Sequence, residues 1–315
     1  MPELVIILLN YRRPEETIAC IESIRRSTYT DYEILVIDNA SGDGSPDRIR
    51  SQCPGIQLLQ NSENLGFAAG NNTGLELFKS GSYVYALLLN NDTEVAPDTL
   101  AALMTAMRSN PAAGILGAKI YFYDRPNVLW FAGGAVNPGS GAVSHRGMLE
   151  TDRGQYDRAG SCDFVTGCCL LVRRAVVDRI GLLDPAFFAY FEDADFCLRA
   201  RRAGFDVRYE PAARLWHKVS STTQWDSPVY LYFTLRNRLI LVKKNSTSLK
   251  SLPYLPALSY FYARQFTRLL LKWRNLPGAR AAWLGMVDGL RSFTGSDGRG
   301  RLDRIGESPG KTGDR

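Results

Sequence analysis

The sequence has no apolar run long enough to cross a membrane and no recognisable secretory signal. Among its 315 residues, no window reaches the roughly 18 uninterrupted apolar positions that a membrane helix needs. The apolar stretch Leu4–Leu9 ends at Asn10-Tyr11-Arg12-Arg13, without a small-residue cleavage site. Leu4–Leu9 is therefore predicted to be a buried strand, and we expect a cytoplasmic protein.

The sequence also lacks two motifs that would indicate redox chemistry. None of the six cysteines forms a Cys-x-x-Cys pair, so free thiols in a reducing cytosol are the simplest interpretation. The adjacent Cys168 and Cys169 can be a redox pair, but we favour two small buried residues in a strand. The turn Asn10–Pro14 contains no Gly-x-Gly-x-x-Gly, which argues against a nucleotide-dependent oxidoreductase.

Acidic residues are nearly absent from the stretch between Leu249 and Arg291. This stretch has seven basic residues and a single acid, Asp288, although the net charge of the whole chain is only +6. Such a bias suggests an anionic partner surface. The overall composition, with 45% hydrophobic and 22% charged residues, is that of an ordinary globular protein with one large or two fused domains.

The N-terminal part of the chain alternates short apolar runs with helical patterns. Strands are predicted at Leu4–Leu9, Glu33–Asp38, Ile56–Gln60 and Tyr83–Asn90. Helices are predicted from Pro14, over Leu65–Phe78 and over Pro97–Ser109. Near-continuous apolar strands separated by helices indicate an α/β fold with a mostly parallel sheet covered on both faces.

Short polar side chains gather where these predicted strands end. The positions are Asn10-Tyr11, Asp38-Asn39, Asn61–Asn64 and Asn91-Asp92. Ligands of such sheets bind beyond the carboxyl ends of the strands. We therefore expect a ligand site at this edge of the sheet.

The C-terminal part has a different pattern. Strands are predicted at Gly114–Tyr123 and Asp163–Arg173 with a Gly-rich loop near 132–147 between them, a helix over Glu192–Gly204, and extended pieces at Phe205–Tyr209 and Ala213–His217. Helical patterns resume at Pro228, and the tail after Thr294 is predicted to be disordered. We expect a domain over residues 1–225, helices over 226–295 and a tail over 296–315.

Four segments of the chain carry distinctive polar motifs. They are Val36–Ser45 (VIDNASGDGS), Asn64–Gly74 (NLGFAAGNNTG), Leu88–Val95 (LLNNDTEV) and Phe187–Arg199 (FFAYFEDADFCLR). In this order and spacing, they resemble the family-2 glycosyltransferases, specifically the branch with bacterial rhamnosyltransferases of cell-wall and O-antigen assembly. The resemblance covers about residues 3–245. It implies a GT-A fold, in which residues 1–110 bind a nucleotide-sugar and residues 111–225 complete the acceptor side.

The donor side is expected along the ends of the first strands. The carboxylate of Asp38 can accept a hydrogen bond from a nucleobase or a ribose hydroxyl, although Asp also favours turns by bonding its own backbone. The resemblance implies that Asp38 contacts the donor base, and Asn10 and Tyr11 fit the same donor site. We expect Asn64 and Gly66 to line the donor pocket, where glycines also suit tight helix–sheet packing.

A metal site is expected after the fourth predicted strand, at Asn90-Asn91-Asp92. Related nucleotide-sugar sites usually carry Asp-x-Asp, which binds Mg²⁺ or Mn²⁺ across the diphosphate; here Asp92 is the only carboxylate of the three. Such a hard cation prefers oxygen ligands and neutralises the leaving diphosphate. The resemblance implies that Asn91 and Asp92 contact the donor, and that Asp92 and His217 can meet the metal.

The catalytic base is expected in Glu192-Asp193-Ala194-Asp195, which begins a predicted helix. A helix dipole favours acids there, which is a structural alternative. An inverting transfer needs a base for the acceptor hydroxyl, and apolar neighbours and like charges raise the pKa of such a base. By resemblance, Asp193 is the base and Glu192 is the second candidate. Asp195 is expected to pair with Arg199 one turn later.

Two further positions match the family. Thr166-Gly167, within FVTGCC, would lie beneath the sugar. Arg236, within YFTLRNR, can hold a phosphate of the donor bidentately, or it can tie its helix to the domain. Both interpretations of Arg236 remain open from the sequence.

Aromatic and basic residues occur at helical spacing in Leu255–Leu271. This pattern suggests an interfacial helix on an anionic membrane, and no nucleic-acid partner is expected. The alternative is a helical pair that packs on the catalytic domain or on a partner subunit of an oligomer. Lipid-linked acceptors are usual in the resembling branch, so we expect a peripheral protein at the inner face of the cell membrane.

The motifs together predict an inverting, metal-dependent glycosyltransferase that moves a sugar from a nucleotide-sugar to a glycan or lipid-linked acceptor. The resembling branch favours dTDP-rhamnose as the donor, while UDP- and GDP-sugars remain open. The alternative is a catalytically inactive, nucleotide-binding scaffold of a glycan-assembly complex. The intact Glu192-Asp193 and Asp92 disfavour that alternative.

Overall fold

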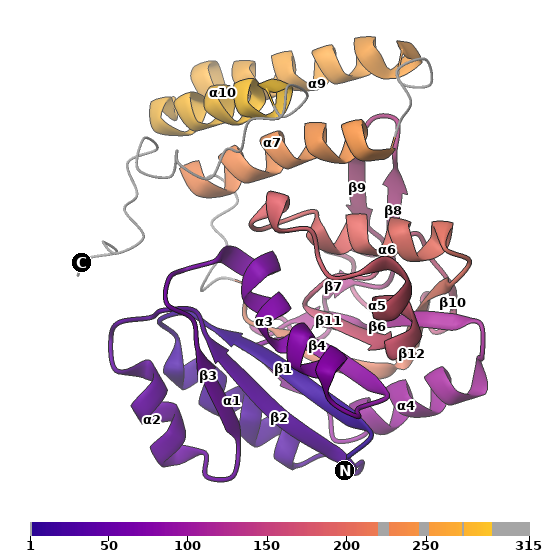
Figure 1. The fold of residues 1–315 in the computed structure, drawn as a ribbon. Helices are drawn as coiled ribbons and strands as arrows, with labels where there is room; N and C mark the ends of the chain where they lie inside the picture. The colour runs from indigo at the N-terminus through magenta and orange to yellow at the C-terminus, as the bar shows by residue number, and fades with distance from the viewer. Residues whose placement is uncertain (1, 220–226, 246–251, 273, 292–315) are drawn as a thin grey trace. The chain divides into compact units, whose positions relative to one another are not determined.

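The computed structural model describes residues 2–219, 227–245, 252–272 and 274–291 (Figure 1). The chain forms two compact units. The first comprises Met1–Ala135, Ser144–Pro185 and Glu192–Val219; the second comprises Val136–Val143, Ala186–Phe191 and Ser220–Arg315. Two short pieces from the middle of the sequence therefore belong to the C-terminal unit.

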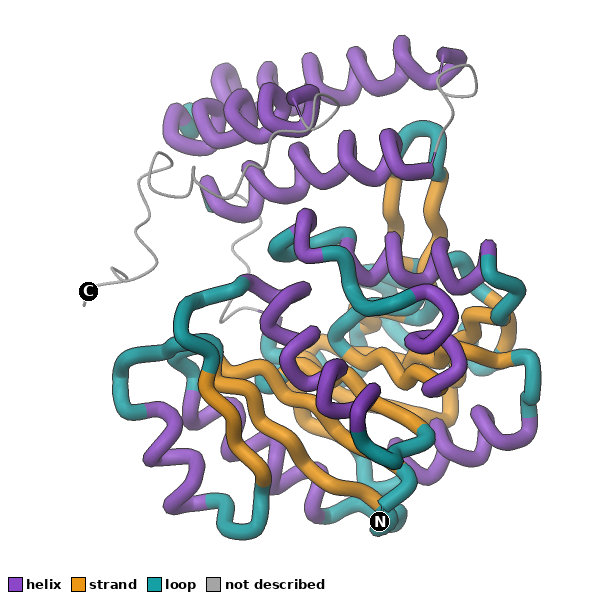
Figure 2. The backbone as a smooth tube through the Cα atoms, in the orientation of Figure 1, coloured by secondary structure: helices purple, strands orange, loops and turns teal. Residues whose placement is uncertain are grey.

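The first unit is built around a mixed sheet with a block of parallel strands. β1 (Leu4–Asn10) pairs in parallel with β2 (Tyr32–Asp38) and β4 (Tyr85–Asn90), and β2 pairs in parallel with β3 (Gln57–Gln60). The register places Asn10 opposite Asp38, at the carboxyl ends of both strands. Nearly every side chain of β1 is buried, which requires cover on both faces of the sheet, as its apolar run predicts (Figure 2).

Beyond β4, antiparallel pairing enters the sheet. β11 (Cys169–Arg173) is antiparallel to both β4 and β6 (Ala113–Phe122), and β12 (Asp206–His217) runs parallel to β6. Shorter strands complete the sheet: β5 (Thr93–Val95), β7 (Leu129–Phe131) and β10 (Gly160–Ser161). Because β12 pairs with β5, His217 lies opposite Thr93 and close to Asp92.

Helices pack against this sheet. They are α1 (Pro14–Arg25), α2 (Ser45–Gln52), α3 (Gly66–Ser80), α4 (Thr99–Ser109), α5 (Arg174–Ile180) and α6 (Glu192–Arg202). Two glycines let α3 approach β1: a Cβ at Gly70 would lie 2.8 Å from Leu9 Cδ1, and one at Gly74 would lie 2.6 Å from Ile7 Cγ2. Gly70 therefore serves the tight helix–sheet packing that the sequence predicts as one role of the glycines near Asn64, and Gly74 serves the same packing.

The second unit consists mainly of helices. They are α7 (Pro228–Asn245), α9 (Leu255–Thr267) and α10 (Leu276–Arg291), with a 3₁₀ turn at Leu252–Tyr254 and a π-helical turn at Arg268–Lys272. An apolar cluster that includes Leu235, Leu239, Tyr262 and Ala282 joins the three helices. None of the described helices is both long and apolar enough to span a bilayer.

Several predicted elements differ from those in the structure. The loop near 132–147 contains a hairpin of β8 (Gly134–Asn137) and β9 (Ala142–His145), and the stretch 163–168 precedes β11 without being a strand. The two extended pieces near 205–217 form one strand, β12, with an irregular register between Glu210 and Arg214. All six cysteines are free thiols, as predicted. The predicted disordered tail lies outside the described residues.

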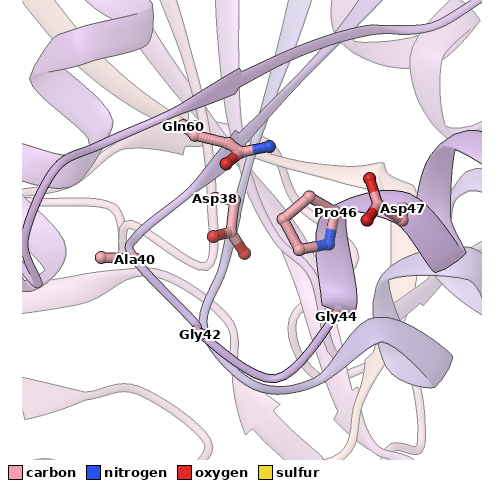
Figure 3. Close-up of a pocket in the computed structure, with 7 residues that line it drawn as sticks. All are labelled: Asp38, Ala40, Gly42, Gly44, Pro46, Asp47 and Gln60. Atoms are coloured by element: carbon pink, nitrogen blue, oxygen red, sulfur yellow. The ribbon is translucent and has the colours of Figure 1, made fainter.

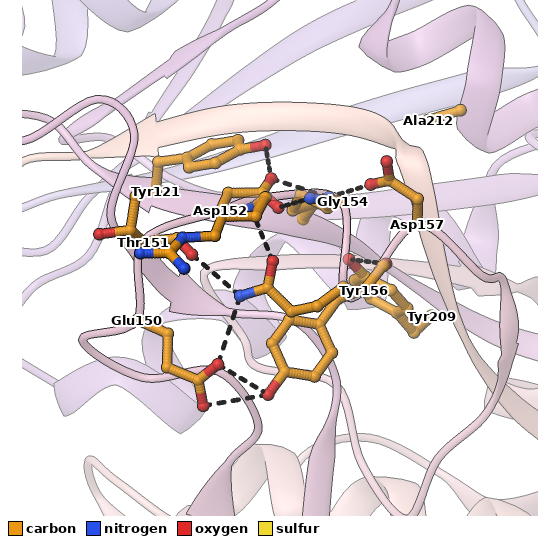
Figure 4. Close-up of polar contacts among 12 residues, drawn as sticks. Tyr121, Glu150, Thr151, Asp152, Gly154, Tyr156, Asp157, Tyr209 and Ala212 are labelled. Carbon is orange, nitrogen blue, oxygen red and sulfur yellow. Dashed lines mark hydrogen bonds and ion pairs between the residues drawn. The ribbon is translucent and has the colours of Figure 1, made fainter.

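A buried lysine ties β6 to the loop that follows β9. Lys119 is only 2% exposed, and its Nζ lies 2.9 Å from Asp152 Oδ2 and also bonds Asp157. Tyr121 donates a hydrogen bond of 2.6 Å to the same Asp152 oxygen (Figure 4). The charge of Lys119 is therefore neutralised inside the protein.

Candidate active site

A chain of hydrogen bonds joins the carboxyl ends of β2, β1 and β4. Asn10 Nδ2 donates to Asp38 Oδ2 at 2.7 Å. Thr17 Oγ1 donates to Asn10 Oδ1 at 2.8 Å and accepts from Asn91 Nδ2 at 2.9 Å. The structure thus brings together Asn10, Asp38 and Asn91. Thr17 carries no signal in the sequence, because its partners lie 7 and 74 positions away.

Asp38 also lines an open pocket of about 340 Å³ beside the end of β2 (Figure 3). The other lining residues come from the turn after β2, from α2 and from β3: Ala40, Gly42, Gly44, Pro46, Asp47 and Gln60. Asp38 Oδ1 accepts a hydrogen bond from the Ser41 amide at 3.0 Å. Its carboxylate therefore shapes the turn and also borders the pocket, so the two interpretations of Asp38 are compatible.

Asn39 organises the loop that contains Asn64 and Gly66. Its Nδ2 donates to Asn64 Oδ1 at 2.8 Å and to the Gly66 carbonyl at 3.1 Å. Its Oδ1 accepts from Asn61 Nδ2 at 3.0 Å and from the Leu65 amide at 3.1 Å. Asn64 and Gly66 are thereby held next to the end of β2. In the sequence, the only indication of this role of Asn39 is its position directly after Asp38.

Asp92 and His217 meet at the ends of β4 and β12. His217 Nε2 lies 3.1 Å from Asp92 Oδ1, and both side chains are buried. Asn90 Nδ2 lies 3.4 Å from the same ring nitrogen. Trp130 packs edge-on against the His217 ring, with centroids 4.7 Å apart and planes at 80°. Trp130 therefore limits the orientation of His217, a role that the sequence pattern does not indicate.

Asp193 is held at the start of α6 by backbone amides. Its Oδ2 accepts from the Gly167 amide at 2.9 Å, and its Oδ1 accepts from the Ala194 amide at 2.7 Å. Thr166 and Gly167 form a tight turn here, since the Cys169 amide donates to the Thr166 carbonyl at 3.1 Å. A Cβ on Gly167 would lie only 3.0 Å from the Phe67 ring. The absence of a side chain at 167 thus allows α3 and Asp193 to share this turn.

Glu192 adjoins Asp193 and is almost fully buried. Its Oε2 has no hydrogen-bond partner among the residues that the structure describes. Burial raises the pKa of Glu192 well above its usual range, and the charges of Asp193 and Asp195 add to this effect. Burial also raises the pKa of Asp193, although the Gly167 and Ala194 amides oppose the shift. Two adjacent carboxylates therefore hold their protons more strongly than free side chains do, as expected of groups that exchange protons in a site.

Asp195 has a structural role, as predicted. Its Oδ2 accepts from Arg199 Nε at 2.7 Å within α6, and Asp195 is fully buried. Arg199 also donates to the carbonyls of Ile180 and Leu182, both at 2.8 Å. The pair thus fastens α6 to the backbone after α5.

Tyr11 and Arg236 make contacts of other kinds. The Tyr11 ring is half-buried, with the Arg12 guanidinium 5.2 Å from its centroid. Arg236 is buried in the second unit, where its Nη1 donates to the Ala186 carbonyl at 2.7 Å and to Asn237 Oδ1 at 2.9 Å. This contact corresponds to a tie between α7 and neighbouring backbone, one of the two interpretations left open by the sequence.

The Asp92–His217 pair suits a divalent cation. One carboxylate oxygen and one imidazole nitrogen lie 3.1 Å apart, so a single ion can contact both. His217 Nδ1 is buried without a partner in the described part of the chain. The described residues contain no group of three or more His, Cys, Asp and Glu placed to hold a metal. Two protein ligands suit an ion that takes its other ligands from phosphate and water.

The sheet and the site together define a class of protein. A mixed sheet flanked by helices has polar side chains along the carboxyl ends of its parallel strands, and the same unit contains an adjacent pair of carboxylates with raised pKa values. This is a glycosyltransferase with the GT-A fold. The chain belongs to glycosyl transferase family 2, whose family model matches residues 5–181.

Two of the relatives among curated proteins are named as glycosyltransferases. The low-salt glycan biosynthesis hexosyltransferase Agl10 of Haloferax volcanii is 25% identical over 313 residues, which cover 95% of this chain and 94% of that protein. The N-acetylglucosaminyl-diphospho-decaprenol L-rhamnosyltransferase of Mycobacterium tuberculosis is 27% identical over 235 residues, covering 67% and 74%. A third, uncharacterised protein y4gI of Sinorhizobium fredii, is 31% identical over 216 residues, and the match spans only 23% of its length.

A solved structure shares the fold. The mannosyltransferase PcManGT from Pyrobaculum calidifontis, in complex with GDP-Man and Mn²⁺, superposes with a TM-score of 0.58. The superposition covers 97% of this chain and 79% of that one, at 16% sequence identity. The likeness extends the GT-A assignment beyond the region that the family model matches.

Proposed function

We propose that the protein transfers a sugar from a nucleotide-sugar to a glycan or lipid-linked acceptor with inversion, and that Asp193 is the base. The observation that carries this proposal is the adjacent pair of a buried Glu192 and a part-buried Asp193, whose pKa values are both raised. The acceptor oxygen attacks C1 of the sugar and its proton passes to Asp193. The bond between C1 and the diphosphate oxygen breaks, and its electron pair leaves with the diphosphate.

The donor would lie along the carboxyl ends of β1, β2 and β4. Asp38 would accept a hydrogen bond from the base or ribose, and Asn10, Asn64 and Asn91 supply neighbouring polar groups. Residues 1–110 would thus bind the nucleotide, and residues 111–225, including Thr166-Gly167, would complete the acceptor side. Glu192 is the alternative base, since it lies next to Asp193 in the same turn of α6.

Asp92 and His217 would hold Mg²⁺ or Mn²⁺, which when bound neutralises charge on the leaving diphosphate. The Mn²⁺ in the mannosyltransferase complex supports this assignment by analogy of fold. We expect Asp92→Asn to weaken Mn²⁺ binding, measured by titration of the free protein. Glu94→Gln is the matched control, because Glu94 is half-exposed and pairs with Arg26.

The donor is proposed to be dTDP-rhamnose, because the mycobacterial relative is named for L-rhamnose transfer. The test is a panel of dTDP-, UDP- and GDP-sugars, scored by thermal shift and by release of nucleotide with and without Mn²⁺. Stabilisation by dTDP-rhamnose and metal-dependent turnover are expected. If the protein turns over only a UDP- or a GDP-sugar, that sugar replaces dTDP-rhamnose as the assigned donor. Binding without any turnover would favour the inactive scaffold.

The second unit is proposed to contact an anionic membrane at the inner face of the cell. Tyr260, Leu271 and Trp283 are 68%, 77% and 55% exposed, an unusual exposure for such side chains. Basic residues accompany them, and the single acid of this stretch, Asp288, is buried against Tyr232. Cosedimentation with anionic but not neutral vesicles is expected. If the protein instead forms a dimer through these helices and binds neither kind of vesicle, the proposed membrane contact is wrong.

A further inference from the structure

The loop Ala186–Phe191 has an unusual backbone conformation. Phe188, Tyr190 and Phe191 have φ of 62°, 68° and 75°, in the left-handed region that residues with a Cβ rarely adopt. Bulky aromatic residues keep such a conformation only where the surrounding structure imposes it. The last residue of this loop is bonded directly to Glu192, the first residue of α6.

Asn237 of α7 holds the backbone of this loop. Its Nδ2 lies 2.8 Å from each of three carbonyl oxygens, those of Phe187, Ala189 and Tyr190. Asn237 is completely buried, and Arg236 Nη1 donates to its Oδ1 at 2.9 Å. The bond from Arg236 fixes which end of the amide carries the donors. The Asn237 amide group is therefore oriented toward the loop.

Aromatic rings add a second set of contacts between α7 and the loop. Phe188 stacks on Phe233 with centroids 4.9 Å apart and planes at 9°. Tyr190 packs edge-on against Tyr230 at 5.1 Å. Phe188 and Tyr190 are both in the left-handed conformation. Side-chain packing and backbone hydrogen bonds thus impose the same loop shape.

We propose that Asn237 is a positioning residue for the catalytic carboxylates, acting through the loop Ala186–Phe191. By fixing the carbonyls of Phe187, Ala189 and Tyr190, it fixes the backbone that is bonded directly to Glu192. The inference rests on the proposed function, in which these carboxylates serve the transfer. Asn237 itself touches neither of them, and its effect is on their placement.

The test is the variant Asn237→Ala in the full chain. We expect kcat for transfer to fall about 10- to 100-fold, because small displacements of reacting groups are costly. The dissociation constant of the donor should stay within about twofold, since the donor groups lie on β1, β2 and β4. A displaced loop would also weaken the burial that raises the pKa of Glu192. The acid limb of the pH–kcat/KM profile should therefore move to lower pH.

Asn245→Ala is the matched control. Asn245 lies on the same helix, but its Nδ2 donates to the Leu241 carbonyl of α7 itself at 2.8 Å. This control should lose stability without a change in kcat or in the pH profile. If Asn237→Ala does not fold, Tyr230→Leu removes only one ring contact with the loop and should lower kcat by a smaller factor.

Asp193→Asn, measured alongside, separates the two ideas. If Asp193→Asn is inactive while a folded Asn237→Ala keeps normal kcat and the normal pH profile, the positioning role is wrong and the proposed base stands. If Asp193→Asn and Glu192→Gln both keep normal turnover, the proposed catalytic pair is wrong. An equal loss of kcat in Asn237→Ala and Asn245→Ala, with unchanged pH profiles, would assign Asn237 a purely structural role.

Discussion

Two buried charged residues of the first unit, Lys119 and Glu192, differ in their surroundings. Around Lys119, each charge meets an opposite one, since its Nζ contacts both Asp152 and Asp157. Around Glu192, the neighbouring charge at Asp193 has the same sign. Glu192 Oε2 also has no hydrogen-bond partner in the part of the chain that is described. The charge of Lys119 is neutralised within the protein, whereas Glu192 is buried beside a charge of its own sign.

The difference separates structural from functional burial of charge. A buried charge is costly unless it is paired and hydrogen-bonded, and the Lys119 group meets both conditions. Folding alone therefore explains Lys119, which ties β6 to the following loop. Folding does not explain Glu192, whose raised pKa is a cost to the folded state. Such uncompensated groups are expected where a substrate or a proton is to be bound.

The largest effect is expected from Asp193→Asn. The amide cannot take the acceptor proton, so kcat should fall by about 10³-fold while donor binding stays nearly unchanged. Stopped assays of sugar transfer measure kcat, and titration with the donor measures its dissociation constant. The matched control is Asp178→Asn, since Asp178 is exposed on α5. If Asp193→Asn retains near-normal turnover, Asp193 is not the base and has a structural role, as the Lys119 group does.

The parallel strands and the polar residues at their ends could be predicted, because each is encoded locally. The runs that form β1, β2 and β4 are continuous apolar segments that a sheet buries on both faces. Asp38 is the last residue of β2 and Asp92 lies two positions after β4, so their placement at one edge of the sheet follows from the fold.

The remaining elements depend on contacts between distant parts of the chain. The three residues of β5 become a strand only by pairing with β12, more than 100 positions later. Trp130 and Thr17 reach the site through a ring contact and through hydrogen bonds that no local pattern encodes. The hydrogen bonds from Asn237 to the loop Ala186–Phe191 likewise join residues about 50 positions apart, as the bond to Phe187 illustrates.

A smaller effect, on stability alone, is expected from Lys119→Met. The change leaves Asp152 without its cation, although Tyr121 still donates to it and the side chain is 14% exposed. We expect the free energy of unfolding to fall by about 2 kcal/mol, less than for a fully buried pair. Urea unfolding measures it, with the exposed Lys79→Met as control. Turnover per folded molecule should not change; a loss of kcat would mean that the Lys119 group also serves catalysis.

The smallest effect is expected from the pH dependence of stability in Glu192→Gln. Because the pKa of Glu192 is raised in the folded protein, the folded state retains a proton that the unfolded state releases. Its burial is therefore tolerated below the unfolded pKa, and stability is lost as pH rises toward the folded pKa. The wild type should lose about 1.4 kcal/mol relative to Glu192→Gln for each tenfold change in proton affinity. Urea unfolding of both proteins between pH 5 and pH 8 measures the divergence. Parallel curves over this range would show that Glu192 is compensated after all, and its contrast with the Lys119 group would disappear.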